Sequence, residues 1–135
     1  MKTKFNLPFA IIAMVVMISC DKNNDVAKGD YQSGVLIVNA GQFGHANGDV
    51  TYYNPTSGAI AQNIYNAVNE KGKSIFAGDD LQSLTVDGNN GYLVNSGGGS
   101  IPVVNINTFK LNSTFTDALL VNPRYLAVIN GKAYV

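Results

Sequence analysis

The sequence has no tryptophan, one cysteine and one histidine, and only 13% of its 135 residues are charged. A single cysteine cannot form a disulfide within the chain, which excludes a fold held together by internal disulfides. Basic and acidic residues are equal in number, at nine each. The chain therefore offers no excess of cations for a nucleic-acid backbone, and we do not expect nucleic-acid binding.

The first twenty residues have the three parts of a bacterial export signal. Two lysines provide a positive start, and an apolar run follows over residues 7–18. The run is shorter than the roughly 20 apolar residues that span a bilayer, but it suits a signal-peptide core. It ends in the letters MISC, which resemble the lipobox of bacterial lipoproteins. We therefore predict a signal peptide over residues 1–19 and lipidation of Cys20.

Residues 20–33 are predicted to be a lipidated, flexible tether. The letters DKNNDVAKGDYQS are polar and carry no apolar period that could be buried. This also disfavours the alternative that the N-terminal run is an ordinary core helix with an unpaired cysteine. An acidic, lysine-containing stretch directly after the cysteine resembles the surface-export signal of Bacteroidota lipoproteins. The resemblance implies a lipid anchor in the outer membrane, with the protein exposed at the cell surface.

The mature part is predicted to be all-β. Removal of the two signal lysines leaves seven of the nine basic residues against nine acidic ones, a net charge of −2. The 14 glycines and the Tyr/Val/Ile-rich runs indicate short strands joined by tight turns. No sustained helical period follows residue 20.

An internal repeat indicates how the strands are organised. Residues 84–94 match residues 126–135, because Leu84 corresponds to Leu126 and Tyr92 to Tyr134, both at an offset of 42. A period of about 40–45 residues is typical of the four-stranded blades of a β-propeller. Upstream, two further segments match the second and third strands of the next unit: residues 35–39 match 91–95, and residues 50–54 match 101–105.

We therefore predict a partial β-propeller over residues 34–135, with a little over two four-stranded blades. The first blade covers 34–65, the second covers 82–116, and a third begins at 124–135. The expected strands lie near 34–39, 49–54, 59–65, 82–87, 91–95, 101–106, 110–116, 124–129 and 132–135. The chain ends inside an expected strand, so we interpret it as a fragment. A small β-sandwich is the alternative, but a sandwich does not require the 42-residue repeat.

These segments, from GVLIVNAGQFGHANGDVTYY to NPRYLAVINGKAYV, resemble a family of Bacteroidota surface-lipoprotein propellers with YVTN-like, surface-layer-type repeats. The resemblance implies about seven blades in complete members. Some members capture cobalamin for an outer-membrane transporter, and many have no assigned ligand. The resemblance thus implies a nutrient- or ligand-binding protein, with a corrinoid as one candidate ligand and a TonB-dependent-type transporter as the candidate partner. It implies no cofactor.

In such blades the loops after the second and fourth strands lie at one end of the molecule. That end is expected to carry the long loops, at 40–48, 66–80, 96–100 and 117–122. Binding residues concentrate on loops that a rigid scaffold holds. The ligand-binding candidates lie in the first of these loops and are Gln42, Phe43, His45 and Asn47. Phe43 could stack on a planar ligand or pack inward as an anchor of the loop.

The sequence offers no set of residues for catalysis or metal binding. His45 has no neighbouring partner for general-base or metal chemistry. Asp79 and Asp80 lack the spacing of a calcium loop, and residues 97–100 lack the lysine of a phosphate loop. We therefore expect a protein that is not an enzyme. The alternative to ligand capture is a surface adhesion or protein–protein scaffold.

Overall fold

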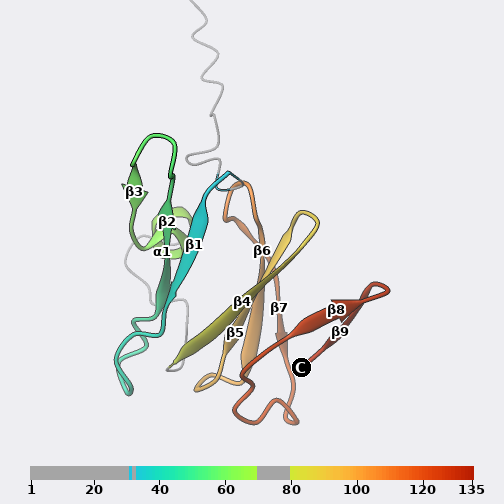
Figure 1. The fold of residues 1–135 in the computed structure, drawn as a ribbon. Helices are drawn as coiled ribbons and strands as arrows, with labels where there is room; N and C mark the ends of the chain where they lie inside the picture. The colour runs from blue at the N-terminus through green and yellow to red at the C-terminus, as the bar shows by residue number, and fades with distance from the viewer. Residues whose placement is uncertain (1–30, 32, 70–79) are drawn as a thin grey trace, which may run out of the picture.

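The computed structural model describes residues 31, 33–69 and 80–135, and it is all-β with antiparallel sheets, as predicted from composition (Figure 1). The predicted signal peptide, Cys20 and most of the predicted tether lie outside the described residues. The elements are β1 (Val35–Asn39), β2 (Asp49–Tyr53), β3 (Ile60–Ala61), α1 (Ile64–Asn69), β4 (Leu81–Asp87), β5 (Asn90–Asn95), β6 (Ser100–Asn105), β7 (Leu111–Thr116), β8 (Ala127–Ile129) and β9 (Lys132–Tyr134).

The strands form three sheets, each built from neighbours in the sequence. The first sheet has the order β1-β2-β3, the second β4-β5-β6-β7, and the third β8-β9. Every pairing is antiparallel, because each strand returns directly beside the one before it. Short connections of this kind are the ordinary way to build up-and-down sheets.

A large hydrophobic core lies between the first and second sheets. Leu36 and Val38 of β1 belong to it, together with Val50 and Tyr52 of β2. The second sheet contributes Leu81, Leu84, Leu93, Val104 and Ile106, and the turn after β6 adds Phe109. Tyr31 completes this core: its ring meets those of Tyr52 and Phe109 edge-on, at centroid distances of 5.1 and 5.5 Å.

A smaller core lies between the second and third sheets. It is formed by Val94, Ile101 and Leu126, with Tyr92, Leu120 and Val128 packed around them. The second sheet is therefore covered on both faces, which explains the near-continuous burial of β6 from Ile101 to Val104. Strands buried on both faces read as uninterrupted apolar runs.

Helix α1 occupies part of the segment that was predicted to be a strand over 59–65. The strand β3 covers only residues 60–61, since Asn63 has a positive φ of 53° that ends the extended conformation. The buried carboxylate of Asp49 then accepts the backbone N–H groups of Tyr65 and Asn66, at 3.0 and 3.1 Å. Donors at a helix start need such an acceptor, so Asp49 fixes the short helix against β2.

Two turns in different sheets have the same hydrogen-bond pattern. The side-chain oxygen of Asn54 accepts from the N–H groups of Thr56 and Ser57. Fifty-one positions later, Asn105 accepts in the same way from Asn107 and Thr108. The backbone bonds also repeat. In the first turn, the N–H of Gly58 donates to the carbonyl of Asn54, and the N–H of Asn54 donates to the carbonyl of Ala59. In the second turn, Phe109 donates to Asn105 and Asn105 to Lys110 in the same way. Gly58 and Phe109 both have positive φ.

The residues matched by the sequence repeat also face equivalent directions. Leu36 and Val38 of β1 face the second sheet, and their counterparts Tyr92 and Val94 of β5 face the third. The matched residues of β2 and β6 follow the same rule. Val50 and Tyr52 of β2 lie in the core between the first and second sheets. Their counterparts in β6, Ile101 and Val103, lie between the second and third sheets. The packing of the first sheet on the second is therefore repeated in the packing of the second sheet on the third.

Candidate binding surface

The connections between neighbouring strands alternate between two ends of the molecule. Those after β1, β5 and β7 lie at the bottom of Figure 1, and those after β2, β4 and β6 lie at the top. The bottom end has the long loops after β1 and β7, whereas residues 96–99 after β5, expected as a long loop, form a short turn. The end with the long connections contains all four residues predicted to bind a ligand. It is therefore the first place to look for a binding surface.

The loop between β1 and β2 is held by its own hydrogen bonds. The side-chain oxygen of Asn47 accepts the backbone N–H of Gln42 at 2.7 Å, and the carbonyl of Gln42 accepts the N–H of His45 at 3.0 Å. Gly41 has a φ of +80°, and a Cβ there would lie 2.5 Å from the Asn47 oxygen. Glycine is required at this position because both the backbone conformation and the close approach exclude a side chain.

All four predicted residues are exposed. Hydrogen bonds link three of them, Gln42, His45 and Asn47, through backbone and side-chain atoms. Phe43 lies between them in sequence with 84% of its surface exposed. Of the two interpretations of Phe43, the structure excludes the one in which the ring packs inward.

A second group of exposed apolar side chains lies on the loop between β7 and β8. Leu119, Val121 and Tyr125 are 90%, 74% and 76% exposed. The carboxylate of Asp117 accepts the N–H of Leu119 at 2.8 Å and so shapes the start of this loop. The loop 117–122 was expected at the end with the long loops, but none of these side chains was predicted to bind. The sequence feature that could have identified them is the apolar run Leu119–Val121 within a loop.

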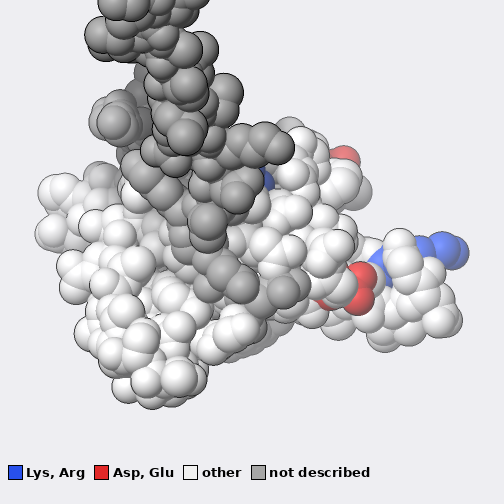
Figure 2. Space-filling view, turned by 90° about the horizontal axis from the view of Figure 1, so that it is seen from above, with Lys and Arg blue, Asp and Glu red and all other residues white. Residues whose placement is uncertain are grey.

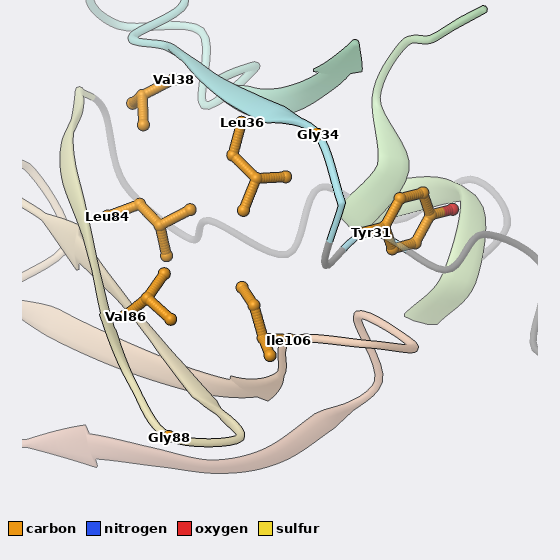
Figure 3. Close-up of a pocket in the computed structure, with 8 residues that line it drawn as sticks. All are labelled: Tyr31, Gly34, Leu36, Val38, Leu84, Val86, Gly88 and Ile106. Atoms are coloured by element: carbon orange, nitrogen blue, oxygen red, sulfur yellow. The ribbon is translucent and has the colours of Figure 1, made fainter. Parts of the chain in front are cut away.

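Two cavities lie between the sheets, away from the predicted loop residues. The first has a volume of about 360 Å³ and is lined by β1 and β4, with Leu36, Leu84, Val86 and Ile106 pointing into it (Figure 3). The second has a volume of about 560 Å³ between the second and third sheets, where Tyr92, Ile101 and Val103 face Leu126 and Val135. The lining of the second is mainly apolar, whereas that of the first is almost equally polar and apolar, and neither includes Gln42, Phe43, His45 or Asn47.

The other side chains considered from the sequence have structural surroundings. Asp80 has a positive φ of 81°, and its carbonyl accepts the N–H of Ser96 at 3.0 Å; Asp79 lies outside the described residues. Residues 96–99 form the turn between β5 and β6, closed by a bond from Gly99 to Ser96. Over the described part of the chain, no three His, Cys, Asp or Glu residues are grouped so that they could hold a metal ion.

Charge is sparse on the surface as well as in the sequence. Seen from above, the visible part of the described surface carries few acidic or basic side chains (Figure 2). The described residues also include no helix with the length and apolar character needed to cross a membrane.

The chain matches a known domain family. A family model described as a domain of unknown function, DUF5074, matches residues 33–135. The matched region contains all three sheets, the two long loops described above, and both cores except Tyr31. No curated protein matches the chain.

Proposed function

We propose that this chain, which belongs to the DUF5074 domain family, is part of a cell-surface lipoprotein β-propeller that binds a small ligand or nutrient. In this proposal, Cys20 anchors the protein in the outer membrane. An outer-membrane transporter of the TonB-dependent type receives the ligand. The proposal assigns no catalytic step to the described residues.

The repeated packing of the sheets supports the propeller. Successive sheets stack face to face with their matched residues in equivalent positions, and two turns share one hydrogen-bond pattern at an offset of 51. A propeller repeats a four-stranded sheet around an axis, and the second sheet has four strands in sequence order. A two-layer sandwich would not need a sheet covered on both faces.

The exposed ring of Phe43 is the observation that carries the binding proposal. A phenyl group with 84% of its surface in water costs free energy unless a partner covers it. Its loop is braced by Gly41 and Asn47, so the ring is presented on a fixed backbone. Planar ligands gain from an aromatic face beside amide groups, and Gln42 and Asn47 provide these amides.

Calorimetric titration of the full chain with cobalamin tests this role. Covering a phenylalanine side chain is worth roughly 1.5–3 kcal/mol, so Phe43→Ala should weaken binding by about tenfold or more. Ile60→Ala is the matched control, because it removes an exposed apolar side chain from β3, outside both long loops. Equal affinities for the wild type and Phe43→Ala would remove Phe43 from the site.

The proposed anchor is tested separately. Cys20→Ala should move the protein from the membrane fraction to the soluble fraction, because the thiol is the only atom in the sequence that can carry the diacylglycerol. Mass spectrometry of the mature N-terminus should show a lipid-modified cysteine as the first residue. A mature protein that begins at Met1 would contradict the anchor.

A second candidate function is a scaffold for protein–protein contact. It is favoured by Leu119, Val121 and Tyr125, three exposed apolar side chains of one loop. Clusters of this kind mark interaction surfaces. Recovery of a partner protein that is lost in Leu119→Ala, with no binding of corrinoids, would favour the scaffold over ligand capture.

A further inference from the structure

Three asparagines of the chain are each followed directly by a glycine, at residues 47–48, 90–91 and 130–131. Such a pair can react within itself, because the backbone nitrogen of the glycine can attack the side-chain carbonyl carbon of the asparagine. Glycine favours this step, since it has no side chain to shield its nitrogen and its backbone rotates freely. The rate in the folded protein therefore depends on how firmly the structure holds each pair.

Asn90 is held on both edges of its strand. Strand β5 is paired with β4 and with β6, so that Asn90 lies opposite both Asp87 and Asn105. The next residue, Gly91, is buried, and a Cβ there would lie 3.1 Å from the side chain of Val104. The nitrogen of Gly91 can therefore reach the side chain of Asn90 only after the sheet has opened.

Asn47 is exposed, but its side chain and its neighbour are braced. The side-chain oxygen of Asn47 accepts the N–H of Gln42 at 2.7 Å, which fixes the amide group. Gly48 is buried, and a Cβ there would lie 2.7 Å from the carbonyl oxygen of Ala40. Reaction at this pair therefore requires the loop between β1 and β2 to give up a hydrogen bond and its close packing.

Asn130 and Gly131 form the two-residue turn between β8 and β9. They have positive φ angles of 52° and 72°, as a type I′ hairpin turn requires. Both residues are exposed, and a Cβ on Gly131 would meet no atom of the described residues within 4 Å. The turn projects at the free end of the hairpin (Figure 1). Of the three pairs, this one is held least.

The exposure of this turn does not depend on further sheets. The equivalent turn of the second sheet, residues 88–89 between β4 and β5, belongs to a sheet with a core on each face. Residues 88–89 are nevertheless exposed, and a Cβ on Gly88 would also meet no atom within 4 Å. Neighbours that pack against the faces of a sheet thus leave the tip of this hairpin in water. Exposed tips of this kind open readily.

We propose that Asn130 is a site of spontaneous deamidation and that it reacts faster than Asn47 and Asn90. The nitrogen of Gly131 bonds to the side-chain carbonyl carbon of Asn130 and loses its proton. The carbon–nitrogen bond of the side-chain amide breaks, and ammonia leaves with that proton. One water then opens the cyclic imide at either carbonyl, which yields aspartate or isoaspartate and adds one negative charge.

Isoaspartate changes the hairpin itself. It routes the main chain through the side chain and so adds one main-chain atom between β8 and β9. The two-residue turn sets the register that places Ile129 opposite Lys132, and the longer connection no longer fits this register. Because Val128 of β8 packs against the smaller core, the reaction loosens the hairpin where it meets the second sheet.

The three rates are measured by peptide mass spectrometry on the full chain in detergent, kept in mildly alkaline buffer. A parallel sample in urea gives the rate of each pair without structure, and each native rate is divided by it. Asn130 should keep most of its urea rate, whereas Asn90 should be slowed by about tenfold or more, because a strand paired on both edges rarely opens. Asn47 should fall between them. Equal slowing of Asn130 and Asn90, or a higher ratio at Asn47 than at Asn130, would overturn the proposal.

Asn130→Gly is the matched variant for the effect on the hairpin. Two glycines also accept positive φ at both turn positions, but the variant has no amide to lose at residue 130. After prolonged incubation, hydrogen exchange at residues 127–134 should become faster in the wild type and stay unchanged in Asn130→Gly. An equal increase in both proteins would show that the hairpin loosens without this reaction and would overturn the effect assigned to isoaspartate.

Discussion

At the scale of single residues, Asp49 makes the clearest structural contribution. Asp49 is 1% exposed, and among the described residues its carboxylate is held by backbone N–H groups. One oxygen accepts the N–H groups of Val50 and Tyr65, and the other accepts that of Asn66. A buried carboxylate is tolerated when several donors surround it. Asp49 therefore joins the start of α1 to the start of β2.

Asp49→Ala should destabilise the domain by about 1–3 kcal/mol, because buried N–H groups of α1 lose their acceptor. Asp49→Asn should cost less, since its amide oxygen can still accept from one or two of them. Urea denaturation of the full chain, followed by tyrosine fluorescence, measures both. The exposed Asp87→Ala is the control and should shift stability by less than about 0.5 kcal/mol. An unchanged midpoint for Asp49→Ala would contradict the capping role.

Tyr31 predicts how stability depends on alkaline pH. Burial raises the pKa of its phenol above the ordinary value of 10.0, and the neighbouring Tyr52 raises it further. A raised pKa in the folded state favours the protonated phenol there. This contribution is therefore complete below the unfolded pKa and is lost as pH rises through the folded one. The free energy of unfolding should fall above about pH 10, and less steeply in Tyr31→Phe than in the wild type. Identical slopes would contradict the prediction.

The sequence predicted the position of the loop between β1 and β2 better than the contacts within it. Glycines, a histidine and a lone phenylalanine between two apolar runs are enough to identify residues 40–48 as a loop. The conformation of the loop that carries Phe43 includes the bond from the N–H of Gln42 to the side-chain oxygen of Asn47. The residue pattern does not predict this bond. The role of Asp49 was missed for the same reason, because its partners lie 16 and 17 residues away.

At the scale of elements, the turns that follow β2 and β6 are the strongest sign of a structural repeat. Their sequences, NPTSGA and NINTFK, share only the asparagine at the first position. The hydrogen bonds are nevertheless the same, because an asparagine oxygen can take two successive N–H groups at the start of a turn. The hydrogen bonds of the two turns therefore reveal the repeat more clearly than their sequences do.

We expect Asn105→Ala to cost more stability than Asn54→Ala. Each change removes two bonds to backbone N–H groups, worth about 0.5–1.5 kcal/mol apiece. Only the second turn, however, positions a core residue: Phe109 is fully buried at a positive φ of 56°. Misplacing its ring would disturb the contact with Tyr31. Thermal denaturation of the two variants measures the difference. A larger loss in Asn54→Ala would contradict the prediction that the buried ring of Phe109 makes the second turn more important for stability.

The strand predictions were accurate where the apolar pattern was long and failed where it was short. Strands β4 to β7 lie close to the expected segments because each is an apolar or β-branched run between turn residues. The segment 59–65 failed because its end is governed by Asn63 and by the distant Asp49. Local pattern indicated an extended chain, and a tertiary contact converted its second half into a helix.

At the scale of the whole molecule, the described residues leave two sheet faces without a neighbour. On the first sheet, Val35 and Ile37 point away from the core and are 49% and 46% exposed. Their counterparts in the second sheet, Gly91 and Leu93, are buried against the first sheet. On the third sheet, Ile129 and Tyr134 are similarly exposed, at 57% and 56%. Each face has the composition of an interior surface.

We therefore expect residues 21–135, expressed alone, to associate in solution through these faces. Apolar sheet faces in water are driven together, and units of a repeat depend on their neighbours for stability. Sedimentation velocity should show oligomers that grow with concentration. Ile37→Lys should reduce them, because it places a charge in the centre of the face of the first sheet, whereas Thr114→Lys on the already polar β7 should not. A monodisperse monomer with a sharp thermal transition would show that two open sheet faces are tolerated, and the reason for expecting further sheets beside them would be lost.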